Sequence, residues 1–221
     1  MIINRDMLPT EDIIPISYMS GTGGNFLCHF IVSAKRNIQD IIELSKYGNS
    51  HDHGSKDIAG PPYGITMPDH VKIDFILNNE KSVKVEKPYY TNAHIVDVEL
   101  INSAFKKSIR ITYDPDDISD ISAAYYGKFR VDVRKTKLSI NHPANLEVTL
   151  LQSKFNEKFK KNENMPNVLF VSWKELFKEN IDDLITKLSI FTDINAENFS
   201  KESLIHWRNK TQYCIDTFTE T

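Results

Sequence analysis

The feature of this sequence that most constrains its fold is a β-rich apolar run that passes directly into a glycine-rich turn. Residues Ile13–Met19 read IIPISYM, and the turn SGTGG follows without a break. Apolar residues then recur at helical spacing from Phe26 to Ala34, which predicts a helix capped by Asn25. The stretch therefore predicts a buried strand, a tight loop and a helix in immediate succession.

The remainder of the chain alternates patterns typical of strands and helices. The strand candidates are SIRITYD and NVLFVSW. The helix candidates are Ile38–Leu44, DVELINSAFKK, DDISDISAAYYGKF, residues 145–161 and two further helices after NVLFVSW. Such alternation favours one α/β domain over residues 1–221, with a largely parallel sheet flanked by helices.

Residues 47–90 interrupt this alternation and predict a long excursion. Tyr47–Pro68 is rich in Gly, Pro, Ser and His, a composition typical of an irregular surface loop or lid. Val71–Val85 alternates in two short stretches around four polar residues, which predicts a hairpin.

Composition narrows the classes of function. The 221 residues include 40% hydrophobic and 26% charged side chains and carry a net charge of -3, as in a folded globular protein. This charge disfavours a sequence-independent nucleic-acid or membrane-surface binder. The chain has two cysteines without a Cys-x-x-Cys pair, no signal-peptide pattern at its start, and no run of ~20 apolar residues. We therefore expect a soluble, intracellular (cytoplasmic) protein with no nucleic-acid or membrane partner.

The glycine-rich turn has the residue types of an anion site. The backbone N–H groups of such a turn point inward, the helix N-terminus adds partial positive charge, and glycine allows close approach. The candidate binding residues are Ser20, Gly21, Thr22, Gly23, Gly24 and Asn25. The turn lacks the Lys-Ser/Thr pair of the Walker pattern and the third glycine of G-x-G-x-x-G. A tight strand-to-helix turn without a ligand is the alternative.

Four further motifs follow this turn along the chain. They are Thr91-Asn92-Ala93-His94, Tyr113-Asp114-Pro115-Asp116-Asp117, Tyr125-Tyr126 with Ser119 or Ser122 before them, and VLFVSWKELFKENIDDLITKLSIFTDI. With the glycine-rich turn, this order resembles that of the cytosolic sulfotransferases over Ile13–Trp207. The resemblance implies a three-layer P-loop NTPase-like fold and an enzyme that uses 3′-phosphoadenosine 5′-phosphosulfate (PAPS).

The resemblance also implies roles for single residues. His94 would be the base that takes the acceptor proton, a task that suits an unperturbed pKa near 6.5; taken alone, it is better explained as a structural histidine. Ser122, Arg208 and Lys210 would bind PAPS together with the glycine-rich turn. The acceptor would be a hydroxyl or amine of a small molecule, glycan or peptide, covered by the excursion at residues 47–68.

Two departures from the family pattern keep other functions open. Met19 stands where the family has a lysine, and Tyr113 stands where it has an arginine. The loss of both cations favours a non-catalytic binding module that kept the fold. A kinase-like P-loop enzyme is the other alternative, with Asp114, Asp116 and Asp117 as the only obvious magnesium ligands.

A metal site is not predicted. His51, Asp52, His53 and His70 are residue types that bind transition metals. His51 and His53 lie two residues apart, but a third and a fourth ligand at a known spacing are missing. The site implied by the resemblance needs no metal.

Overall fold

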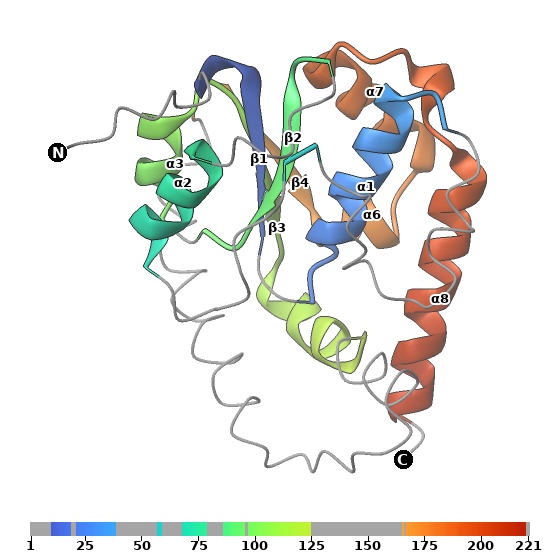
Figure 1. Cartoon of the computed structure of the whole chain (residues 1–221). Coiled ribbons are helices and arrows are strands. Elements are labelled where there is room, and N and C mark those ends of the chain that lie inside the picture. Colours follow the sequence, from blue (N-terminus) through green and yellow to red (C-terminus); the bar gives the residue numbers. More distant parts are fainter. Residues whose placement is uncertain are drawn as a thin grey trace, which may run out of the picture.

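A four-stranded parallel sheet forms the centre of the structure, a computed structural model that describes residues 10–18, 21–38, 57–58, 68–78, 86–95, 97–124, 165 and 167–219. The strands within these ranges are β1 (Ile13–Ser17), β2 (Tyr89–Ala93), β3 (Ser108–Thr112) and β4 (Val168–Ser172). They lie in the order β2-β1-β3-β4, and every neighbouring pair is parallel (Figure 1). The predicted α/β class and parallel sheet are confirmed.

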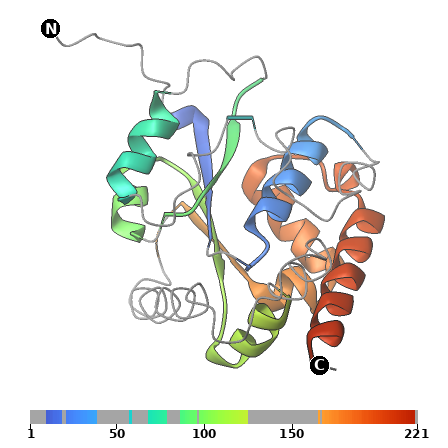
Figure 2. The ribbon, with the colours of Figure 1, turned by 60° about the horizontal axis from the view of Figure 1, so that its bottom comes forward.

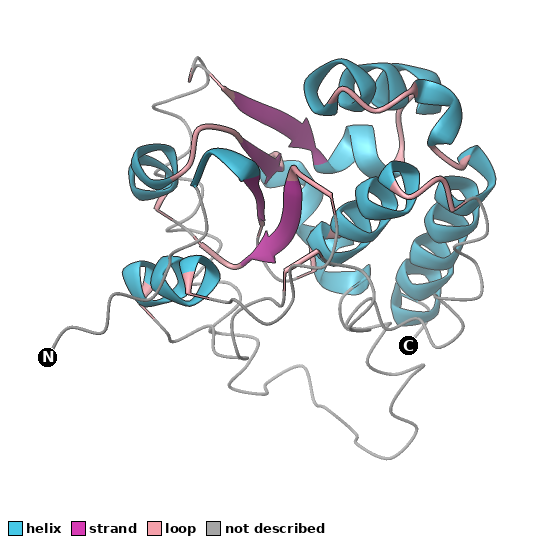
Figure 3. Cartoon of the chain, turned by 45° about the horizontal axis from the view of Figure 1, so that its top comes forward, coloured by secondary structure: helices cyan, strands magenta, loops and turns pink. Residues whose placement is uncertain are grey.

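Helices cover both faces of the sheet (Figure 3). One face carries α1 (Gly24–Lys35), α6 (Trp173–Phe177), α7 (Ile181–Thr192) and α8 (Lys201–Thr219). The other carries α2 (Asp69–Leu77) and α3 (Val98–Ala104). Single turns of 3-10 helix occur at η1 (Thr10–Asp12), η4 (Pro115–Asp117) and η5 (Ala196–Asn198), and residues 118–124 are helical.

The central strand β1 is buried along its whole length, which explains why its sequence is almost continuously apolar. Ile14 and Ile16 point into the core beneath α1, whereas Ile13 points into the core beneath α2 and α3. Because side chains alternate along a strand, one short segment contributes to two separate cores. A polar strand at this position would leave both layers of helices without a surface to pack against.

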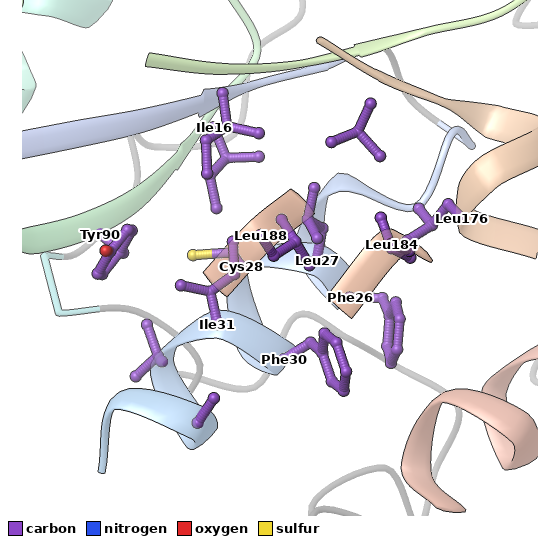
Figure 4. Close-up of a cluster of buried hydrophobic side chains, with 14 of the residues drawn as sticks. Ile16, Phe26, Leu27, Cys28, Phe30, Ile31, Tyr90, Leu176, Leu184 and Leu188 are labelled. Atoms are coloured by element: carbon purple, nitrogen blue, oxygen red, sulfur yellow. The ribbon is translucent and has the colours of Figure 1, made fainter. Parts of the chain in front are cut away.

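The core on the α1 side, part of which is drawn in Figure 4, includes more of the described buried residues than the core beneath α2 and α3. Leu27, Phe30 and Ile31 on α1 are at most 1% exposed and lie between the sheet and the C-terminal helices. The ring of Phe26 stacks on Trp207 of α8, with a centroid separation of 4.7 Å and an interplanar angle of 9°. The first turn of α1 is thereby held against α8.

Two local predictions were wrong. The hairpin predicted over Val71–Val85 is helix α2 as far as Leu77, with Lys72, Ile73, Ile76 and Leu77 buried. The alternation of apolar residues was too short to distinguish a strand from a helix. Asn25 does not cap α1: Gly23 is the N-cap residue, in the left-handed region, and makes no side-chain cap.

Several other predicted elements were either confirmed or lie outside the described residues. The strands in IIPISYM, SIRITYD and NVLFVSW and the helix in DVELINSAFKK are present. Three helices, rather than two, follow β4. The helix predicted over residues 145–161, residues 39–44 of the helix predicted over Ile38–Leu44, and most of the excursion at 47–68 lie outside the described residues.

Candidate functional site

The sheet order defines where a ligand site belongs in this fold. The chain leaves β1 toward β2 and leaves β3 toward β4, so the two connections run to opposite sides. In open α/β sheets, ligands bind outside the carboxyl ends of the strands at such a switch point. The glycine-rich turn follows β1, and the segment Tyr113–Asp117 follows β3. Both motifs therefore lie at the expected edge, which Figure 2 brings forward.

The turn has the backbone conformation that glycine permits. Gly21 and Gly23 both have φ of 89°, in the left-handed region. Thr22 between them is fully buried. Met19 and Ser20 lie outside the described residues.

Packing explains why residues 23 and 24 are glycines. An added Cβ at Gly24 would lie 1.9 Å from Cγ of Tyr18, and one at Gly23 would lie 2.8 Å from Cζ of Phe177. Both distances are far shorter than van der Waals contact, so aromatic rings fill the space beside these residues. This geometry supports the alternative of a tight strand-to-helix turn.

A hydrogen-bonded cluster joins the turn to β2. The Tyr18 hydroxyl donates to Asn25 Oδ1 at 2.6 Å and accepts from Asn92 Nδ2 at 3.0 Å. Asn92 Nδ2 also donates to Asn25 Oδ1. The rings of Tyr18 and His94 lie against each other, with centroids 4.3 Å apart and an interplanar angle of 53°. The structure thus brings His94 together with the start of α1.

The backbone around His94 is held by side chains from two elements, α2 and β1. The Lys72 ammonium of α2 donates to the His94 carbonyl. Ser17 Oγ at the end of β1 donates to the Ile95 carbonyl at 2.6 Å, and the Asp97 N–H donates to Asp69 Oδ2 at 2.7 Å. The position of the segment after β2 is therefore set by specific hydrogen bonds.

The carboxylates after β3 are engaged by the protein itself. Lys174 Nζ lies 2.7 Å from Asp114 Oδ2 and 3.7 Å from Asp117 Oδ1. The hydrogen bond that Lys174 donates to Asp114 raises the pKa of Lys174. Asp117 Oδ2 accepts from the Asp114 N–H at 3.0 Å, closing a capping box at η4. Two of the three carboxylates considered as magnesium ligands thus bind a lysine or a backbone N–H.

Arg208 and Lys210 lie on α8. The Arg208 guanidinium donates to three carbonyls at the end of α6: to Leu176 from Nε at 3.0 Å, to Glu175 from Nη2 at 2.7 Å and to Glu179 from Nη1 at 2.6 Å. A role in PAPS binding would require these bonds to open. Lys210 is partly exposed.

Ser122 and Tyr113 occupy the region between the sheet edge and α8. Ser122 is half-buried in the helical residues 118–124, which follow β3. Tyr113 belongs to a buried cluster with Ile121, Trp173 and Ile215, and burial raises its pKa well above the usual value. The position at which the resemblance places an arginine is therefore filled by a neutral phenol within a packed core.

Sequence reasoning missed Tyr18 and Asn92 as parts of the site. Each is buried and lies at the carboxyl end of its strand, or one residue beyond it. A polar residue at the end of each of two strands that pair in parallel was the signal that could have found them. Their pairing itself depends on the register, in which Ser17 of β1 lies beside Ala93 of β2.

The described ranges contain neither a cluster of metal ligands nor a membrane-spanning helix. No three His, Cys, Asp or Glu side chains come together there in a way that could hold a metal ion. His70 is exposed on α2, and His51, Asp52 and His53 lie outside the described residues. None of the helices in these ranges is long and apolar enough to cross a membrane.

The candidate site combines a glycine-rich turn, a histidine and two asparagines near the switch point of the parallel sheet. No protein-family model matches the chain, and the search of curated proteins gives no match either.

Proposed function

We propose that this chain is a sulfotransferase-like enzyme with a P-loop-like fold, which transfers a sulfuryl group from PAPS to a hydroxyl or amine acceptor. One observation carries the proposal: the His94 ring packs on Tyr18, whose hydroxyl binds Asn25 in the first turn of α1. The candidate base and the candidate anion loop are thus neighbours at the switch point. Ser122 follows β3 at the same edge.

The residues at this edge suit an in-line transfer to a neutral acceptor. PAPS supplies a sulfuryl group whose bond to the 5′-phosphate oxygen breaks as the acceptor oxygen or nitrogen bonds to sulfur, and the departing bisphosphate keeps the electron pair. His94 would accept the acceptor proton. The N–H groups of Gly21–Asn25 would offer preorganised dipoles to the charge that develops on the leaving phosphate.

The backbone of the turn fits an anionic donor better than the side chains around it do. The two left-handed glycines and the N-terminus of the 12-residue helix α1, which has no side-chain cap, favour a phosphate. Lys174 and Arg208 are two candidates to replace the missing family cations, and both bind protein oxygens. A bound donor would have to compete for them.

Calorimetric titration with adenosine 3′,5′-bisphosphate, compared with ATP plus magnesium, tests the proposal. We expect the bisphosphate to bind at micromolar concentration and ATP to bind weakly. Preference for ATP with magnesium would instead identify a kinase-like enzyme. Turnover of PAPS with a panel of hydroxyl and amine acceptors then tests the reaction.

The role of His94 is tested by a matched pair of variants. His94→Ala should lower turnover by about 10²–10⁴-fold while the bisphosphate still binds, because general base catalysis contributes that much. His206→Ala, on the exposed side of α8, is the control and should leave turnover unchanged. Equal activity of the two variants would refute His94 as the base.

A non-catalytic binding module is the second candidate function. It is favoured by Arg208, which is held by α6, and by Tyr113, which is buried where the resemblance places an arginine. A wild-type protein that binds neither nucleotide would support this candidate and contradict the enzyme.

A further inference from the structure

We propose that Tyr18 is a positioning residue that aims the His94 imidazole at the glycine-rich turn. This inference rests on the proposed function, in which His94 is the base. Tyr18 lies between β1 and the turn, is 3% exposed and contacts both the turn and the segment after β2. Neither composition nor any motif in the sequence pointed to it.

The Tyr18 ring has two close neighbours. One is Gly24, where even a methyl group would overlap the ring. The other is the His94 ring, tilted by 53° at a centroid distance of 4.3 Å. Aromatic pairs at this separation prefer defined relative orientations, so a fixed tyrosine ring restricts the rotation of its neighbour.

The hydroxyl keeps that ring in place. It donates to Asn25 and accepts from Asn92, so it bridges the first turn of α1 and strand β2. Both asparagines are at most 7% exposed, and buried hydrogen bonds of this kind are costly to leave unmade. The phenol therefore fixes the distance between the two elements that carry the candidate loop and the candidate base.

The main chain at His94 is held by side chains other than Tyr18, so the position of the main chain and the orientation of the ring can be tested separately. Lys72 holds its carbonyl, and Ser17 holds the next one. Loss of the Tyr18 hydroxyl should therefore leave the main chain of this segment in place and release only the ring orientation. A misplacement of about 1 Å in a catalytic group can cost roughly a hundredfold in rate.

The first test observes the imidazole directly. In protein with ¹³C-labelled histidine, the His94 ring signals are assigned with His94→Gln and compared in wild type, Tyr18→Phe, Tyr18→Leu and Tyr90→Phe. Tyr90 is a matched control, because it is a fully buried tyrosine of β2 that packs in the core on the α1 side. We expect the His94 signals to move in both Tyr18 variants and to stay unchanged in Tyr90→Phe.

The second test is kinetic. Tyr18→Phe should lower kcat by roughly tenfold to a hundredfold while KM for PAPS and Kd for the bisphosphate stay within about twofold, since orientation is lost and binding is kept. Unchanged kcat or unchanged His94 signals in Tyr18→Phe would overturn the inference. If the wild type transfers no sulfuryl group, the proposed function fails, and the ring signals alone decide whether Tyr18 orients His94.

Discussion

Beside the glycine-rich turn, the α1 side of the sheet packs through apolar side chains, whereas the α2 and α3 side combines an apolar cluster with buried charges. The ion pairs that the buried Asp57 makes with Lys35 and Arg36 lie at the opposite, C-terminal end of α1. On the α2 and α3 side, burial lowers the pKa of the fully buried Arg110 of β3, and the Asp69 carboxylate acts to raise it. At the end of the sheet that carries the candidate site, the two layers are thus stabilised by different kinds of interaction.

This difference separates two tasks at the candidate site. Apolar packing on the α1 side shapes the glycine-rich turn, because aromatic rings fill the space beside Gly23 and Gly24. Charged and polar groups on the other side hold the segment after β2, through Lys72, Ser17 and Asp69. The burial of apolar surface has no preferred direction, whereas hydrogen bonds fix a carbonyl or an N–H at a defined position.

The largest effect is expected from disruption of the apolar core on the α1 side. Leu27→Ala removes a fully buried side chain of α1 and should lower the free energy of unfolding by about 4 kcal/mol, because a cavity remains in a close-packed core. Ile190→Ala on α7, where the side chain is 79% exposed, is the control and should cost less than about 0.5 kcal/mol. Urea unfolding measures both, and similar costs would show that the α1 side is not the tighter core.

The next largest effect is expected from removal of a charge partner on the α2 and α3 side. Asp69→Asn removes the carboxylate that faces Lys72 and Arg110, and it should cost about 3 kcal/mol because a buried positive charge loses its partner. Asp120→Asn makes the same substitution in an exposed pair with Lys178 and should cost no more than about 0.5 kcal/mol. A small cost for Asp69→Asn would mean that packing alone stabilises both sides.

A third experiment tests the contact between Gly24 of the turn and the Tyr18 ring. Gly24→Ala should cost about 2 kcal/mol, because its Cβ would overlap the Tyr18 ring. Combined with Tyr18→Leu, the cost should be smaller than the sum of the single costs by about 1 kcal/mol or more, since the clash is relieved. Additive costs would place the strain in the backbone rather than in the ring contact.

The smallest effect is expected at high pH. Burial and the nearby Asp57 carboxylate raise the pKa of Tyr90, so the folded protein keeps a proton that the unfolded chain releases above about pH 10. The free energy of unfolding should fall above that pH, by about 1.4 kcal/mol per pH unit for this group, and be unaffected by it below.

Tyr90→Phe isolates this contribution. The difference in unfolding free energy between the variant and the wild type should be constant up to about pH 9 and should then shift in favour of the variant. Urea unfolding across this range measures it. A difference that stays constant to about pH 11 would contradict a raised pKa for Tyr90.

Local patterns predicted most of the described sheet. Continuous apolar runs identified β1 and β4, and the alternation in SIRITYD identified β3. The local patterns failed where they were short. The segment of α2 was predicted as a hairpin, because nine residues are compatible with the period of a strand and with that of a helix. The burial of Ile73, Ile76 and Leu77 on one side shows that the segment is a helix. The roles predicted for the site residues stay predictions, although His94 and the turn do lie at one edge.

The sequence by itself determined that a buried strand enters a glycine-rich turn and a helix, because periodicity and glycine content are local properties. Only the tertiary structure decided which polar groups meet. Tyr18 and Asn92 are 74 residues apart in the chain, and parallel pairing of β1 with β2 brings them within hydrogen-bonding distance. Likewise, Arg208 binds carbonyls of α6 because α8 packs beside it. Such contacts depend on register and packing between distant segments, which no local pattern encodes.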